Sequence, residues 1–307
     1  MYLEHFQLEK FPFTLTPNVE FFCNLSGHQA ALNVILFSLG SGDGFIKITG
    51  EVGAGKTILC RKLLNTLDDT YVTAYIPNPD LNPSGLHRAF ARELGIAIPG
   101  HVDHAGLLEL MTKKLLELNA AGKKVVLLID EVQAVPDESL EAIRLLTNLE
   151  TETEKLLQIV LFAQPELNSR LNKNEFRQLK QRIIFSYNLI PLTREEMNSY
   201  LCHRLAIAGY TKGSIFFPDA CDLLFKASKG IPRVINILCH KSMLVAYGQD
   251  KKVVDKLSMQ KAVQDSQDIT KPKYSRLKRF FIFCGVFMVF VGFGALYYEY
   301  LAYLFNF

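Results

Sequence analysis

The chain has 307 residues, of which 49% are hydrophobic and 21% are charged, a composition that excludes a wholly disordered protein. Its 34 Lys and Arg residues against 31 Asp and Glu residues leave a net charge of +3, which is too small to indicate a nucleic-acid-binding protein. The six cysteines form no CxxC pair and no zinc-spaced group with histidines. Because the N-terminus MYLEHFQLEK is also charged rather than apolar, we expect reduced thiols and a cytoplasmic folded part.

An aromatic-rich lead-in and a helical stretch occupy residues 1–43, which we interpret as a flank packed on the domain after it. From residue 44 onward, apolar runs of strand length alternate with helical patterns. This alternation predicts an α/β core over residues 44–192, with a mostly parallel sheet covered by helices on both faces. The predicted strands lie near residues 45–49, 71–76, 124–129, 157–162 and 183–189.

After the segment PLTREE the pattern contains only helices, up to about residue 266. Thr193 and Glu196 have the spacing of a capping box, so we expect the first of these helices to begin there. Residues 193–266 are therefore predicted to form a second, smaller, all-helical domain.

The end of the chain has the pattern of a membrane anchor. Residues 280–298 contain no charged side chain, and at about 1.5 Å per residue a helix of this length crosses the hydrocarbon core of a bilayer. A buried core helix is the alternative. The linker of residues 267–279 carries five basic residues and no acid in its last nine positions, which places the large domain on the cytoplasmic side and residues 299–307 outside as a short tail.

The segment GEVGAGKT follows the first predicted strand and precedes a helical pattern, which is the setting of a phosphate-binding loop. Its glycines let backbone N–H groups turn toward phosphate oxygens at the N-terminus of a helix. We expect Lys56 to reach the β and γ phosphates of ATP and the Thr57 hydroxyl to bind Mg²⁺. The predicted nucleotide-binding residues are Gly50, Glu51, Val52, Gly53, Ala54, Gly55, Lys56 and Thr57.

The run KVVLLIDEVQ, residues 124–133, has the pattern of a buried strand that ends in two acids. If this strand lies beside the first, Asp130 comes close to the Mg²⁺ ion and Glu131 can polarise the attacking water. Alone the pattern is common, but the upstream phosphate loop favours a catalytic use over an accidental strand end.

Two further segments supply polar candidates. Gln164 ends the fourth predicted strand, where it could contact the γ phosphate or the water; a simple turn residue is the alternative. Arg177 and Arg182 lie just before the last strand, and either could reach the nucleotide of a neighbouring subunit and stabilise transition-state charge. We prefer Arg182 because it is closer to the strand, while a solvated helix face remains the alternative.

In the segment GIPRVINIL, Arg233 occupies the first turn of a helix, where a cation is disfavoured by the helix dipole. A phosphate of the nucleotide is the partner that we expect for it, against a surface arginine. His28 lies in the flank expected to cover the adenine base, but a structural role is the better interpretation of this histidine.

The ordered set GEVGAGKT, VVLLIDEVQ, FAQPEL, FRQLKQRI and GIPRVINIL resembles the AAA+ ATPases, and the segments MYLEHFQLEKFPFTLTPNVEFF, QPEL and RQLKQR resemble the ExeA-like ATPases of bacterial secretion and pilus systems. The resemblance covers residues 1 to about 266. It implies a P-loop NTPase core with strand order 5-1-4-3-2, a helical lid, and assembly into a ring or other homo-oligomer such as a hexamer. It also implies a first-sensor role for Gln164, a finger role for Arg182 and a second-sensor role for Arg233.

The resemblance implies an ATP hydrolase, anchored once in the bacterial inner membrane, that assists assembly of a type IV (MSHA-like) pilus or type II secretion complex. Secretion-type relatives continue into a periplasmic peptidoglycan-binding domain, which we do not expect in this chain. A helper ATPase of DNA transactions is the rival, but no basic face or helix-turn-helix is evident, so no nucleic-acid partner is expected. A scaffold that binds ATP with little turnover is the third alternative.

Overall fold

Five parallel strands form the central sheet of the protein in a computed structural model, which describes residues 2–42, 44–100 and 102–266. The strands lie side by side in the order β2-β3-β4-β1-β5, which confirms the predicted order. Each predicted strand is present, although the last begins at residue 185 rather than 183 because a helix ends at residue 182. Their bounds are Phe45–Gly50 (β1), Tyr71–Ile76 (β2), Lys124–Ile129 (β3), Leu157–Ala163 (β4) and Phe185–Leu189 (β5).

The central strands are apolar along their length because helices cover both faces of the sheet. All seven residues of β4 are buried. Side chains alternate between the faces, so that Phe45 joins one hydrophobic core and Ile46 joins the other. The parallel register pairs Thr49 with Ala163, which brings the carboxyl ends of β1 and β4 to the same edge.

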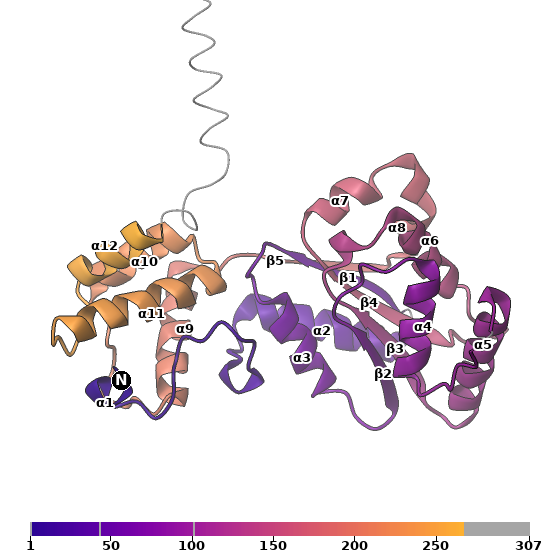
Figure 1. The fold of residues 1–307 in the computed structure, drawn as a ribbon, viewed down its shortest axis with the longest axis horizontal. Coiled ribbons are helices and arrows are strands. Elements are labelled where there is room, and N and C mark those ends of the chain that lie inside the picture. Colours follow the sequence, from indigo (N-terminus) through magenta and orange to yellow (C-terminus); the bar gives the residue numbers. More distant parts are fainter. Residues whose placement is uncertain (1, 43, 101, 267–307) are drawn as a thin grey trace, which may run out of the picture. The chain divides into compact units, whose positions relative to one another are not determined.

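Two layers of helices enclose the sheet (Figure 1). Helices α2 and α3 pack on one face, and α4 to α8 supply apolar side chains to the core on the other face. The helix bounds are Ser26–Ser41 (α2), Lys56–Leu64 (α3), Pro83–Glu93 (α4), His104–Ala120 (α5), Asp137–Leu146 (α6), Glu166–Leu171 (α7) and Arg177–Arg182 (α8), with 3-10 turns at Val132–Ala134 (η2) and Asn174–Phe176 (η3).

Between β5 and residue 266 the described chain is helical, as predicted. The helices are Arg194–Ile207 (α9), Pro218–Ser228 (α10), Pro232–Gly248 (α11) and Lys256–Asp265 (α12). The predicted capping box is confirmed: the Thr193 hydroxyl accepts from the Glu196 N–H, and the Glu196 carboxylate accepts from the Thr193 N–H at 2.9 Å. Such a cap contributes about 1 kcal/mol to helix stability.

The N-terminal flank packs on the late helices before it reaches the sheet. Helix α1, Tyr2–Phe6, lies against α11, where the Tyr2 hydroxyl is 2.9 Å from Nδ1 of His240. The Glu9 N–H donates to the Ala208 carbonyl at 2.8 Å. A 3-10 turn at Val19–Phe21 (η1) then leads into α2, so the flank connects the two parts of the nucleotide-binding region described below.

The chain divides into two units after Ala262, so the sheet and almost all of the helical region belong to the same unit. Among the residues that the structure describes, no helix combines the length and the apolar character needed to cross a bilayer. The predicted linker of residues 267–279, the predicted span of residues 280–298 and the predicted tail of residues 299–307 lie outside the described residues.

Candidate nucleotide-binding site

The loop between β1 and α3 is a tight turn whose backbone conformation depends on glycine. Gly53 and Gly55 adopt φ angles of +83° and +102°, which side chains other than glycine rarely tolerate. The Ala54 N–H closes the turn on the Glu51 carbonyl at 3.0 Å. Helix α3 begins directly after Gly55 without a side-chain cap from the described residues, so its first N–H groups can donate hydrogen bonds to an anion.

Lys56 lies inside this loop and is only 4% exposed. Its Nζ donates to the Gly50 carbonyl at 2.8 Å and to the Glu51 carbonyl at 3.2 Å. Burial lowers the pKa of this lysine, while the nearby carboxylates of Glu131 and Asp130 act in the opposite direction. The ammonium group is therefore held at the centre of the loop by partners that a phosphate can replace.

Thr57 and Asp130 come together as the sequence predicted. The Thr57 hydroxyl donates to Oδ2 of Asp130 at 2.8 Å, and Oδ1 accepts from the Glu131 N–H at 2.9 Å. Asp130 is 2% exposed, and burial raises the pKa of its carboxyl group. A hydroxyl and a carboxylate oxygen at this separation are suitable ligands for Mg²⁺, which takes oxygen donors from one or two protein side chains together with substrate phosphates.

Glu131 follows at the mouth of the loop in a left-handed backbone conformation, with φ of +53°. This conformation costs a residue with a side chain about 1 kcal/mol and is common at functional sites. Oε2 of Glu131 accepts from Nε2 of Gln164 at 3.0 Å and from Nε2 of Gln133. Gln164 therefore lies beside the predicted base. Sequence reasoning did not identify Gln133, for which the only signal was a polar residue two positions after Glu131.

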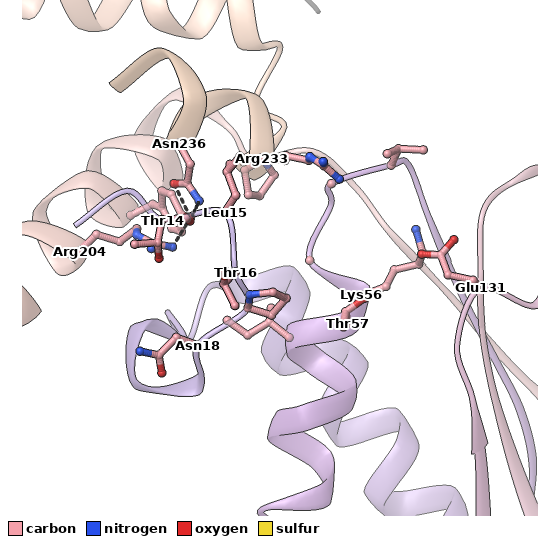
Figure 2. Close-up of a pocket in the computed structure, with 17 residues that line it drawn as sticks. Thr14, Leu15, Thr16, Asn18, Lys56, Thr57, Glu131, Arg204, Arg233 and Asn236 are labelled. Atoms are coloured by element: carbon pink, nitrogen blue, oxygen red, sulfur yellow. Dashed lines mark hydrogen bonds between the residues drawn. The ribbon is translucent and has the colours of Figure 1, made fainter. Parts of the chain in front are cut away.

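Arg233 meets the loop from the other side. Its N–H donates to the Gly53 carbonyl at 3.2 Å, at the N-terminus of α11. An added Cβ on Gly53 would lie 2.5 Å from the Arg233 Cβ, so only glycine permits this approach. Figure 2 shows Arg233, Lys56, Thr57 and Glu131 around one cavity of about 180 Å³.

The opposite wall of the cavity comes from the flank and the late helices. Residues 14–18 line it together with Tyr200, Arg204 and Asn236. Figure 2 shows Thr14, Arg204 and Asn236 on this side of the cavity. The Asn236 side chain donates to the Thr14 carbonyl at 3.4 Å, and Arg204 donates to the Pro12 carbonyl and, at 2.9 Å, to the Tyr200 hydroxyl. No sequence pattern predicted that Tyr200, Arg204 and Asn236 line the cavity, because nothing local indicated that the late helices would contact the flank.

His28 supports the loop and does not line this cavity. Its Nε2 donates to the Ala54 carbonyl at 3.0 Å, and burial lowers the pKa of its imidazole. An added Cβ on Gly55 would lie 2.6 Å from that nitrogen. This geometry fits the structural interpretation of His28.

The two arginines of α8 do not line the cavity. Arg182 donates to the Asn148 side chain at 2.8 Å. A finger acts on the nucleotide of another subunit, so its role stays a prediction.

Comparisons with known proteins show what the chain is similar to. Residues 39–171 match a family model described as "AAA domain". The chain is 40% identical over 249 residues to General secretion pathway protein A of Aeromonas hydrophila; the match covers 81% of this chain and 45% of that protein, so the chain spans about half of its relative's length.

Solved structures share the fold. The Aeropyrum pernix ORC2 protein, solved in ADPNP-ADP complexes, matches with a TM-score of 0.60 and 17% identity over 81% of this chain and 72% of that chain. The Aeropyrum pernix ORC1 protein, solved with DNA, matches with a TM-score of 0.61 and 17% identity over 87% of this chain and 74% of that chain. The fold is thus an α/β P-loop fold of the AAA type.

Proposed function

We propose that this chain is a membrane-anchored ATP hydrolase that assists assembly of a pilus or secretion complex at the bacterial inner membrane. The observation that supports hydrolysis is the convergence of Lys56, Thr57, Asp130 and Glu131, from distant parts of the sequence, on one cavity or its immediate edge. Arg233 reaches the same cavity from α11.

In the proposed reaction a water oxygen bonds to the γ phosphorus of ATP while the bond from that phosphorus to the β–γ bridging oxygen breaks. The products are ADP and inorganic phosphate, and the proton lost by the water passes to Glu131. Lys56 and the N–H groups of the loop hold the phosphates. Thr57 and Asp130 would hold Mg²⁺, which when bound neutralises charge on the β and γ phosphates.

We expect the late helices to act as a lid over the nucleotide, because Arg233 contributes to the cavity from α11 and residues 14–18 tie the flank to the same wall. A γ phosphate near Arg233 would hold the late helices closed over the nucleotide. Loss of this phosphate after hydrolysis would allow the helices to move away. In an oligomer Arg182, or Arg177, would report the nucleotide state to the next subunit.

Two variants test the hydrolase. Lys56→Ala should abolish nucleotide binding, measured by titration with a fluorescent ATP analogue. Glu131→Gln should bind ATP with native affinity and release no phosphate above background. Lys113→Ala, an exposed lysine on α5, is the matched control and should behave as the native protein does. Phosphate release at the native rate by Glu131→Gln would remove the proposed base.

More specifically, we propose a role like that of the protein MshM in biogenesis of the mannose-sensitive haemagglutinin pilus. A role in a type II secretion complex is the alternative. The 40% identity to General secretion pathway protein A supports the broader class. Crosslinking in native membranes, followed by identification of the crosslinked neighbours, would name the partner. Recovery of pilus or secretion components is expected; their absence would count against the assignment.

The anchor belongs to the proposal as well, with residues 280–298 spanning the membrane and the ATPase part in the cytoplasm. Alkaline phosphatase fused after residue 307 should be active if the C-terminus is periplasmic, and the protein should stay in the membrane fraction after a high-salt wash. An inactive fusion would contradict the orientation.

A DNA-transaction helper and a scaffold with little turnover are the alternative functions. The likeness to the Aeropyrum pernix ORC1 and ORC2 proteins does not favour the DNA-transaction helper, since identities of 17% show the fold alone. A gel shift of duplex DNA with the detergent-solubilised full chain, at about 0.15 M salt, tests it, because DNA binding that depends on phosphate contacts weakens steeply with salt. The phosphate-release assay on the native chain tests the scaffold: ATP binding with negligible phosphate release would favour it over a hydrolase.

A further inference from the structure

Two glutamine amides hold the proposed catalytic base. Nε2 of Gln164 and Nε2 of Gln133 both donate to the same oxygen of Glu131, Oε2. A carboxylate oxygen offers about two lone-pair positions, so these two donors fill those of Oε2. The other oxygen, Oε1, has no hydrogen-bond partner among the described residues, and Glu131 lines the cavity.

Gln133 also connects Glu131 to the sheet. Its Oε1 accepts from the Gln164 N–H at 2.9 Å, directly after the end of β4. One amide group thus connects the residue that follows a fully buried strand to the carboxylate of Glu131. A side chain that uses its acceptor and its donor on two such partners has little freedom to rotate.

The backbone that carries Gln133 is itself fixed. Arg170, on α7, donates to the Gln133 carbonyl at 2.9 Å and to the Val135 carbonyl at 2.8 Å, and it forms an ion pair with Asp137. The guanidinium group thereby clamps the turn between β3 and α6. Because Glu131 has a left-handed backbone, this clamp also supports a conformation that an isolated chain would seldom adopt.

We propose that Gln133 is a positioning residue for ATP hydrolysis. Its amide fixes Oε2 of Glu131 against the end of β4 and leaves Oε1 as the oxygen that takes the proton of the attacking water. The inference rests on the proposed function, and it assigns Gln133 no contact with the nucleotide. Loss of the amide should therefore reduce turnover without weakening ATP binding.

The test compares full-length, detergent-solubilised variants in steady-state phosphate release and in titration with a fluorescent ATP analogue. For Gln133→Ala we expect kcat to fall about 10- to 100-fold, a part of the effect of general-base catalysis, while the Kd for ATP stays within about twofold. Gln260→Ala, on the exposed face of α12, is the matched control with native kcat and Kd.

Gln133→Met distinguishes positioning by the amide from mere packing. It keeps the length of the side chain but removes both the donor to Glu131 and the acceptor of the Gln164 N–H. If the amide positions Glu131, kcat should fall as far as in Gln133→Ala while the Kd for ATP stays unchanged; if the side chain only fills space, Gln133→Met should keep the native kcat.

The outcomes are separable. If Glu131→Gln is inactive but Gln133→Ala keeps native kcat, the inference on Gln133 is wrong and the proposed function stands. If Gln133→Ala loses ATP affinity or thermal stability in proportion to kcat, or if Gln133→Met has the native kcat, Gln133 is structural and the inference is again wrong. If Glu131→Gln hydrolyses ATP at the native rate, the proposed function itself fails.

Discussion

Replacing Gly53 with alanine tests how closely the phosphate loop and α11 must approach. Gly53 has φ of +83°, and an added Cβ would lie 2.5 Å from the Arg233 Cβ and 3.3 Å from its Cδ. Left-handed backbone costs alanine about 1 kcal/mol or slightly more. The Arg233 Cβ cannot rotate away, so α11 must shift and the hydrogen bond from the Arg233 N–H to the Gly53 carbonyl, worth about 1 kcal/mol, is lost.

The left-handed strain and the lost hydrogen bond are present with or without ATP, so they lower the stability of the free variant by about 2 kcal/mol. The free variant can relieve the clash by moving α11 away, but ATP bound between the loop and Arg233 requires the original distance. The cost of forcing the added Cβ against Arg233, about 1–3 kcal/mol as at other overpacked sites, therefore falls on binding. We expect the Kd for ATP to rise at least about fivefold, since each 1.4 kcal/mol is a factor of ten.

Titration with a fluorescent ATP analogue measures the change in Kd, and thermal unfolding measures the loss of stability of the variant without ATP. Gly122→Ala is the matched control, because Gly122 has φ of +71° but nothing within 4 Å of an added Cβ. It should lose about 1 kcal/mol of stability and bind ATP normally. Native ATP affinity in Gly53→Ala would refute the close approach of Arg233 to the loop.

Other predictions concern stability and the flank. His87 is 2% exposed, and burial lowers the pKa of its imidazole from 6.5 to about 4. Between these pH values the unfolded chain binds a proton that the folded chain does not, so the free energy of unfolding measured in urea should fall by up to about 3 kcal/mol from pH 6.5 to pH 4. His87→Leu should make the free energy of unfolding less dependent on pH in this range. Thr193→Ala removes the capping box and should lower the free energy of unfolding by about 1 kcal/mol in the same assay, while an unchanged value would mean that Glu196 alone suffices. Arg204 is 5% exposed, and Arg204→Ala removes the donor to the Pro12 carbonyl and the Tyr200 hydroxyl. Residues 14–18 should then lose their fixed position in the cavity wall, and the Kd for ATP should rise at least about tenfold. Unchanged affinity would show that this wall does not contact the nucleotide.

Much of this protein was readable from local patterns. The alternation of apolar runs and helical segments predicted the five strands, and the capping box marked the start of α9. The loop at residues 50–57 and the acids after β3 predicted the centre of the cavity, because short motifs with a fixed mechanism need only local sequence and a parallel sheet to meet. The strand order came from resemblance to a family rather than from the residues themselves.

What the sequence by itself determined is the set of groups that can grip a triphosphate: a glycine turn, a lysine, a hydroxyl and two acids, each adjacent in the chain to the element that carries it. Only the tertiary structure decided what surrounds them. The hydrogen bond of Gln133 to Glu131, the approach of Arg233 to Gly53 and the wall built by residues 14–18 with Arg204 join residues whose partners are set by packing. Such contacts have no local signature, because the free energy that forms them comes from burial of other residues.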